Sequence, residues 1–200
     1  MPAIISKKEL RNINSQLVKD KKFVQETKKI VESEFKEIHK TFLNKFDAHP
    51  VTMEIKNGAQ STNISGTLGG VGNLFTYIGF SSGAQPISTL RLILQRYDIR
   101  YSTEAQSIKI TIEVPTKEEV FRATPLPWAT GRSWARGIER GLSGFGHYLV
   151  KNTRISKSKS GFAIQTNAPV RAGRFSNTPY MSSLLNDYYK EIQKLERKRF

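Results

Sequence analysis

The chain has 200 residues, of which 38% are hydrophobic and 24% charged, the proportions of an ordinary globular protein rather than of a disordered tail or a coiled rod. It contains no cysteine, which excludes a disulfide framework, thiolate metal sites and a cysteine nucleophile. Its formal net charge of +15, from 32 basic and 17 acidic residues, favours polyanions or acidic protein surfaces as partners.

The sequence has no membrane signal. No stretch approaches the roughly 18 to 20 apolar residues that a spanning helix needs. The N-terminal MPAIISKKELRN has only a short apolar run before its charges, which does not fit a signal peptide. We therefore expect a soluble protein with no membrane partner, which stays in the cytoplasm of the cell that makes it.

Residues 7–47 predict one long amphipathic helix or two helices in series. Pro50 ends this stretch, because a proline disfavours helix in the residue before it. The faces away from the apolar side chains are rich in Lys and Glu. The apolar side chains lie on nearly one face: Leu17, Val24, Val31, Phe35, Ile38, Phe42 and Phe46.

The middle of the chain mixes apolar runs with a long loop. Residues 51–55, VTMEI, alternate like a strand, and Asn57-Gly58 follows as a turn. Residues 59–72, AQSTNISGTLGGVG, predict a loop of a length that is usually functional or ordered by a partner. Residues 74–78 predict a short strand or a hydrophobic anchor, and residues 86–95 a buried helix.

The clearest strand is SIKITIEV at residues 107–114, in which the apolar and polar side chains alternate. One polar face predicts an antiparallel sheet that is covered on one side only. Thr116 and Glu119 form the capping-box pattern at the start of a short helix. Residues 124–128 predict an extended connector, and residues 133–140 predict another short helix.

The last quarter predicts two strands and a helix. Residues 148–150 and 161–165 read as strands joined across a basic loop at 151–160. A helix over residues 178–198 follows, capped by Asn177 or Thr178, with Pro179 in its first turn. Its apolar stripe consists of Met181, Leu184, Leu185, Tyr188, Ile192 and Leu195.

These elements predict an α+β fold. We expect an antiparallel sheet, including residues 51–56, 107–114 and 161–166, that is covered on one side by the long N-terminal helix and the C-terminal helix. Long interaction loops at 57–73 and 151–160 complete it. Residues 1–50 would form an N-terminal helical arm and residues 51–200 the α+β domain, with one domain overall as the alternative.

The catalytic patterns in the sequence are weak. Ser81 lies in GFSSG, which matches G-x-S-x-G, and His147 is its downstream candidate base, but a nucleophile elbow needs a strand before the serine and a helix after it. The glycines of residues 66–72 lack the Gly-Lys-Ser/Thr ending of a phosphate loop. His39 and His49 have no metal-ligand spacing. We therefore expect no enzyme activity, no catalytic residue, no cofactor and no metal.

A basic segment stands out near the C-terminus, with six cations and no acid between residues 151 and 174. It contacts either DNA phosphates, without base readout, or acidic surfaces of partner proteins, or it is a solvated loop. The candidate contacts are Lys151, Arg154, Lys157, Lys159, Arg171 and Arg174. The candidate interface anchors, because Trp and Arg are favoured at interfaces, are Trp128, Arg132, Trp134 and Arg136, with an ordinary core position as the alternative for each tryptophan.

The run TPLPWATGRSWARGIERGLSGFGHYLV, followed by SKSKSGFAIQT, resembles virion proteins of tailed, myovirus-like phages, and the earlier HPVTMEIKNGAQSTNISGTLGGVGNLFTYIGF is similar to the N-terminal half of that group. The resemblance covers roughly residues 45–185. It implies a structural protein of the neck, head–tail connector or tail-completion type, in a homo-oligomeric ring of sixfold or twelvefold symmetry, assembled in the host cytoplasm.

That resemblance also implies the partners: further copies of the chain and other neck, tail or portal-side proteins. If the basic loop faces the lumen of the ring, genomic DNA is a further partner, bound without sequence readout. The alternative interpretation is a sequence-nonspecific nucleic-acid-binding protein, and a serine hydrolase is the third.

Overall fold

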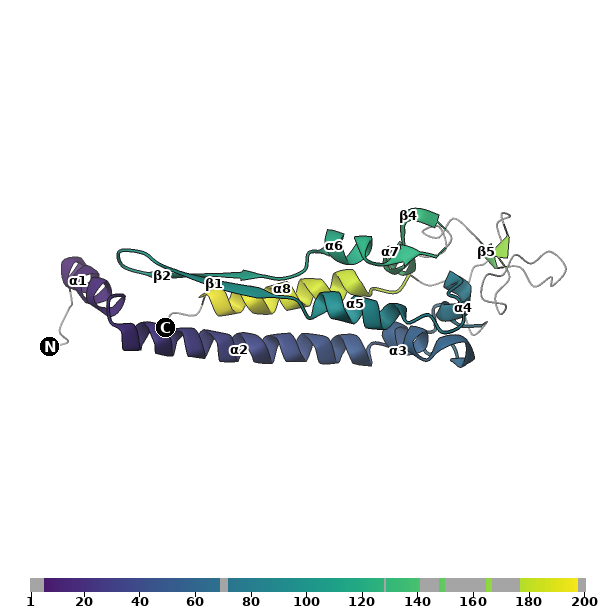
Figure 1. Ribbon diagram of the computed structural model, residues 1–200, viewed down its shortest axis with the longest axis horizontal. Helices are drawn as coiled ribbons and strands as arrows, with labels where there is room; N and C mark the ends of the chain where they lie inside the picture. The colour runs from purple at the N-terminus through teal and green to yellow at the C-terminus, as the bar shows by residue number, and fades with distance from the viewer. Residues whose placement is uncertain are drawn as a thin grey trace.

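The computed structural model describes residues 6–68, 72–127, 129–140, 148–149, 165–166 and 177–197. Its longest element is helix α2 (Lys21–Ala48), and the C-terminal helix α8 (Met181–Arg197) runs beside it in the opposite direction (Figure 1). At a rise of about 1.5 Å per residue, the 28 residues of α2 span about 42 Å. The molecule is therefore elongated. No helix in the described part of the chain is long and apolar enough to cross a membrane.

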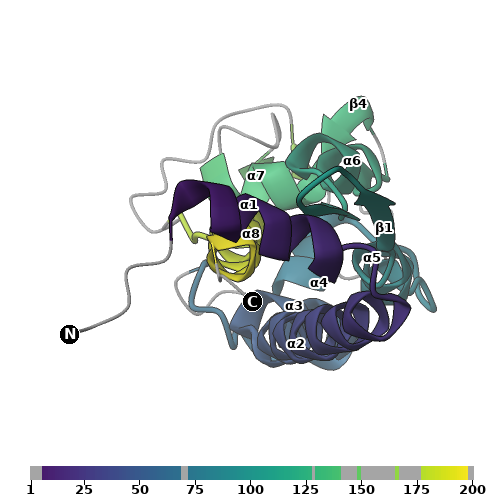
Figure 2. The same cartoon turned by 90° about the vertical axis from the view of Figure 1, so that its left-hand side faces the viewer.

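The N-terminal stretch forms two helices in series, and the break follows from local capping. In α1 (Lys7–Leu17) the Ser6 hydroxyl accepts from the Glu9 N–H at 3.2 Å, and the Glu9 carboxylate accepts from the Ser6 N–H at 2.8 Å. Asp20 then starts α2, because its carboxylate accepts from the N–H groups of Lys22 and Phe23. Helix α1 consequently turns away from α2 and crosses one end of the body (Figure 2).

Helices α2 and α8 pack through aromatic side chains. The rings of Phe42 and Tyr188 stack with centroids 4.2 Å apart, and the Tyr188 hydroxyl lies 2.8 Å from Nδ1 of the buried His39. These contacts confirm most of the apolar stripes predicted for both helices, with positions three and four apart, while Leu17, Val24, Ile38 and Leu184 are half-buried. The buried side chains are Thr27, Val31, Phe35, His39, Phe42, Leu43 and Phe46 on α2, and Met181, Leu185, Tyr188, Ile192 and Leu195 on α8.

The burial of two histidines in this region predicts that stability depends on pH. Burial lowers the pKa of both His39 and His49 below the ordinary imidazole value, although backbone hydrogen bonds at Gln95 and Pro179 partly oppose the shift. The unfolded chain, with histidine pKa values of about 6.5, therefore binds more protons than the folded one as the pH falls through that value. The stabilisation is complete above about pH 6.5 and is lost on acidification.

We expect the free energy of unfolding, measured by urea titration, to fall between pH 7.5 and pH 5.5. In the double variant His39→Gln/His49→Gln this fall should flatten, because the two titrating groups are gone. A pH slope that is unchanged in the double variant would assign the dependence to other groups.

The predicted strand at residues 51–55 is wrong: this segment lies in helix α3 (Pro50–Lys56). His49 caps the helix through its Nδ1, which accepts from the Val51 N–H at 3.2 Å, and Pro50 occupies the first helical position. The burial does not follow the apparent alternation, since Met53 is 40% exposed whereas the polar Thr52 and Glu54 are fully buried. Five alternating residues were too few to outweigh the helix-start signal before them.

The loop after α3 is organised by two polar side chains of its own chain. The Glu54 carboxylate accepts from the backbone N–H groups of Ser65, at 2.7 Å, and Leu74, at 2.6 Å. The Asn73 amide donates to two carbonyl groups of the loop. Hydrogen bonds within the chain thus hold the described part of the loop, which includes the short helix η1 (Gly58–Gln60).

Residues 74–78 form a helix, α4 (Leu74–Ile78), rather than a strand, and all five are buried, as expected of a hydrophobic anchor. The predicted buried helix is confirmed as α5 (Pro86–Leu94), although its Leu92 is 63% exposed.

The strand at residues 107–114 is confirmed as β2 (Ile108–Glu113), and it pairs antiparallel with β1 (Asp98–Thr103). This ribbon extends along α2 (Figure 1), where the Tyr101 hydroxyl donates to the Glu32 carboxylate at 3.2 Å. Burial, together with the Glu32 charge, raises the pKa of Tyr101 to about 12. One face of β2 packs on the core, as its alternation predicts.

The single sheet predicted from three segments is wrong, because the described strands form three separate two-stranded antiparallel ribbons. The second pairs β3 (Pro125–Leu126) with β4 (Ala129–Ser133), and the third pairs β5 (Tyr148–Leu149) with β6 (Gln165–Thr166). The α+β class stands. Helices, rather than a sheet, provide most of the core.

Two short helices, α6 (Lys117–Arg122) and α7 (Trp134–Arg140), cover the other side of α8 (Figure 1). The capping box of Thr116 and Glu119 is confirmed at the start of α6. The predicted cap of α8 by Asn177 or Thr178 is wrong, since the helix begins at Met181. Its first turn is instead capped from α7: the Glu139 carboxylate accepts from the backbone N–H and the hydroxyl of Ser182 at 2.5 and 2.7 Å.

Candidate anion-binding site

A cavity of about 610 Å³ lies between α6, β4 and α7, and arginine side chains line it. Four guanidinium groups face a single carboxylate among the lining residues. These residues are Glu118, Phe121, Arg122, Gly131, Arg132, Ser133, Arg136, Gly137 and Arg140. The arginines come from three elements, so only the folded chain brings all four together.

Local hydrogen bonds hold the start of α7 and thereby aim its side chains. The Trp134 backbone N–H donates to the Thr124 carbonyl at 2.7 Å, and the Thr124 and Ser133 hydroxyls lie 2.7 Å apart. The Ser133 hydroxyl also accepts from the Arg136 N–H at 3.1 Å, as an N-terminal cap does. Arg136 and Arg140 are one turn apart on this helix and therefore share a face.

Trp134 and Ile138 occupy the opposite side of α7 and are buried. The Trp134 ring meets Phe80 edge-on at 5.9 Å and stacks with Tyr180 at 6.3 Å. Because this side is anchored in the core, the arginine side of α7 has a defined orientation. The helix is amphipathic with a cationic outer face.

The guanidinium of Arg136 lies over the Phe121 ring, with its carbon 4.6 Å from the ring centroid. Such a cation–π contact contributes about 0.5–1 kcal/mol at an exposed site, and it also restricts the arginine side chain. On α6, hydrogen bonds from Thr116 lower the pKa of Glu119, which lines a separate neighbouring pocket, and the charges of Arg122 and Arg96 act in the same direction.

Chemically, this arrangement is suited to binding an anion. Arginine presents a planar set of donors that matches carboxylate or phosphate oxygens. Among the residues that the structure describes, no three His, Cys, Asp or Glu side chains lie close enough to hold a metal ion. The site therefore offers positive charge and donors.

The structure separates the predicted interface anchors. Arg132 and Arg136 both line the cavity, whereas Trp134 is 2% exposed and belongs to the core, as in its alternative interpretation. Trp128 lies outside the described residues. So do all six cations of the basic segment: Lys151, Arg154, Lys157, Lys159, Arg171 and Arg174.

Two members of the site, Arg122 and Arg140, were not predicted. Arg140 could have been found from the sequence, because Arg132, Arg136 and Arg140 follow each other at intervals of four around a predicted helix. Arg122 carries no such signal. Its place depends on the packing of α6 beside α7.

Ser81 does not lie in a nucleophile elbow. The segment before it is helix α4, which ends at Gly79 in the left-handed conformation, with φ of 84°, and not a strand. The Ser81 side chain is exposed, and His147 lies outside the described residues. The geometry that the hydrolase interpretation needs on the N-terminal side of the serine is therefore not formed.

In comparisons with known proteins, no protein-family model matches the chain, no curated protein matches it, and no solved structure matches its fold.

Proposed function

We propose that the chain is a non-enzymatic structural subunit of a tailed-phage particle, which forms a homo-oligomeric ring at the neck or proximal tail and acts in head–tail joining or tail completion. The resemblance of roughly residues 45–185 to myovirus-like virion proteins supports this proposal. Its partners are other copies of the chain, neighbouring neck, tail or portal-side proteins, and the genomic DNA that passes through. Its location is the virion.

The observation that carries the proposal is the uncovered helix α1. None of its 11 residues is buried. Its apolar side chains nevertheless gather on one face, and Leu10 and Ile13 are 48% and 43% exposed. Isolated helices shorter than about 12–15 residues are marginal in water, and most helical stability comes from burying an amphipathic face. Helix α1 is therefore stabilised best when another surface covers it.

In the proposed assembly, that surface belongs to the next copy of the chain. Helix α1 crosses the end of the elongated body (Figure 2), so it is placed to extend beyond its own subunit. A helix that docks on a different face of its neighbour makes a head-to-tail contact, and such contacts close into rings.

This assembly predicts a specific effect of charge on the apolar face of α1. The variant Leu10→Asp/Ile13→Asp should shift the purified protein from oligomer to monomer in sedimentation velocity, since two carboxylates would be buried at the contact. Its circular dichroism melting temperature should change little, because neither side chain is part of the core.

The matched control is Asn12→Asp/Gln16→Glu, which adds the same charge at two exposed polar positions of α1. It should assemble like the native chain. Loss of assembly in both variants, or in neither, would contradict the role of the apolar face. Purified phage particles in which mass spectrometry finds no copy of the chain would contradict the virion role itself.

A nonspecific nucleic-acid-binding protein is the second candidate, and the arginine-lined cavity favours it. The two candidates differ in what the native chain does alone. A stand-alone binding protein would bind DNA tightly as a monomer with a steep salt dependence, and it would be absent from purified particles.

A further inference from the structure

We infer that the arginine-lined cavity between α6, β4 and α7 binds the phosphate backbone of nucleic acid without reading its sequence. The virion proposal gives this cavity no role, and the second candidate function uses it without saying which residues contact which part of the nucleic acid. The inference does not depend on ring formation, because all four arginines belong to one chain.

The first argument is the match between the arginines and a phosphate chain. Side chains one helical turn apart have Cβ atoms about 5–6 Å apart, which is the relation of Arg136 to Arg140. A nucleic-acid strand advances about 3.4 Å along the helix axis per phosphate, and because the strand also winds around the axis, consecutive phosphates are farther apart in space than this advance. Neighbouring guanidinium groups can therefore contact consecutive phosphates of one strand, with Arg122 and Arg132 extending the contact.

The second argument separates nucleic acid from an acidic protein surface. Protein interfaces are built around apolar and aromatic anchors that become buried. The cavity has one such side chain, Phe121, which is already 9% exposed and covered by Arg136. The other lining residues are charged, or are glycine and serine. A partner protein would therefore have charged groups to contact but no further apolar surface to bury.

The third argument is preorganisation. Arg136 is restricted by Phe121, and the start of α7 is held by Ser133 and Thr124. Trp134 anchors the far side of the helix in the core. Binding therefore requires little ordering of the site. The net charge of +15 adds a long-range attraction for a polyanion.

The test is a fluorescence anisotropy titration of the full-length chain against a short labelled DNA duplex of arbitrary sequence, at several salt concentrations. Each phosphate contact contributes about 0.9 to the slope of log K against log salt. One contact is therefore worth about eightfold in affinity at 0.1 M salt relative to 1 M salt. We expect Arg132→Gln/Arg136→Gln to weaken binding about 60-fold and to reduce the slope by about 1.8. Arg122→Gln/Arg140→Gln, which leaves the Phe121 contact intact, should behave in the same way.

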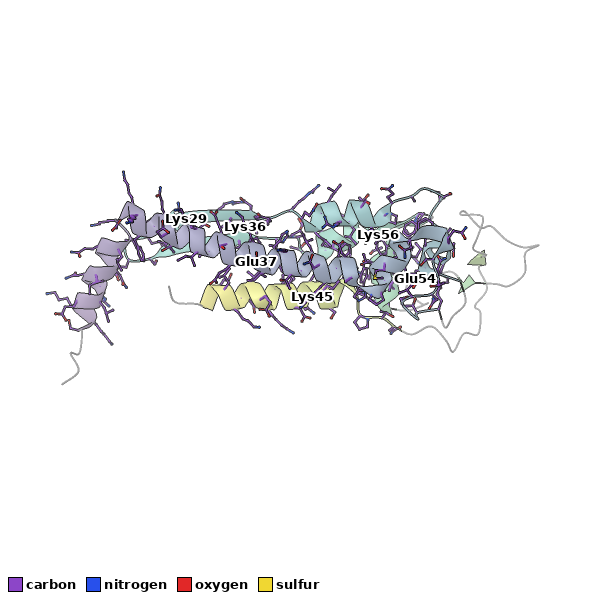
Figure 3. All side chains as sticks on the ribbon, turned by 90° about the horizontal axis from the view of Figure 1, so that it is seen from below. Lys29, Lys36, Glu37, Lys45, Glu54 and Lys56 are labelled. Carbon is purple, nitrogen blue, oxygen red and sulfur yellow. The ribbon has the colours of Figure 1, made fainter. Side chains whose placement is uncertain are left out.

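The matched control is Lys36→Gln/Lys45→Gln, which removes the same charge from α2. Figure 3 shows both lysines on α2 from below, whereas α6 and α7 lie on the upper side of the body in Figure 1. Beyond a Debye length of about 10 Å at 0.1 M salt, these charges act weakly, so the control should bind within about threefold of the native chain. Arg132→Lys/Arg136→Lys keeps the charge and should keep the salt slope.

Three results would overturn the inference: no DNA binding by the native chain at low salt, equal losses in the arginine and lysine variants, or displacement of DNA by polyglutamate at equal charge concentration. If one arginine double variant has a circular dichroism spectrum that differs from that of the native chain, the test uses the other double variant. Failure of this test leaves the virion proposal intact, because particle content and α1-dependent assembly are measured separately.

Discussion

Glu54→Ala is expected to lower the free energy of unfolding by about 2–6 kcal/mol, because the buried N–H of Leu74 and the partly buried N–H of Ser65 lose their acceptor, and each such loss costs about 1–3 kcal/mol. The Glu54 side chain is fully buried, and its two oxygens accept from the N–H groups of Ser65 and Leu74. One carboxylate therefore ties the loop after α3 to the start of α4.

The measurement is urea unfolding followed by circular dichroism, together with amide hydrogen exchange. Exchange at Ser65 and Leu74 should accelerate more than elsewhere, since these amides lose their acceptor directly. The control is Glu37→Ala, an exposed carboxylate on α2 (Figure 3), which should change stability by less than about 0.5 kcal/mol. Equal stability of the two variants would contradict the structural role of Glu54.

Trp134→Ala should cost about 3–5 kcal/mol of stability, the usual range for removing a buried large aromatic side chain. The ring is 2% exposed and lies between Phe80 and Tyr180. The substitution should also weaken DNA binding at the cavity, because the anchored side of α7 then no longer holds the arginine side in place.

The variant also distinguishes the two interpretations of this tryptophan. If Trp134 is a core residue, its replacement lowers the melting temperature of the chain at every protein concentration. If Trp134 is an interface anchor, its replacement leaves the isolated subunit stable and lowers only the fraction of the protein that assembles. Trp134→Phe should recover most of the stability, since it keeps an aromatic ring in the same contact.

Some of the fold could be predicted from local patterns. Both long helices carry their apolar positions at helical spacing over several turns, and β2 alternates over its whole length. The type of the short elements could not be predicted in the same way. Residues 51–55 and 74–78 each have only five residues, too few for one periodicity to exclude another, and both are helices.

The candidate site was predicted in part. The sequence predicts Arg132 and Arg136 as interface residues, and both line the cavity. Trp134 was selected with them because tryptophan and arginine are common at interfaces, but neighbouring positions on a helix point to different sides. The tryptophan faces inward and the arginines outward.

The sequence by itself determined the α+β class, the two long amphipathic helices, the β2 strand and the capping box of α6, because each of these depends on residues close together in the chain. The tertiary structure decided which segments pair and which side chains meet. The cap of α8 by Glu139, the support of the loop by Glu54 and the meeting of four arginines join residues from separate elements. Contacts between distant segments depend on how the whole chain packs, and no local spacing encodes them.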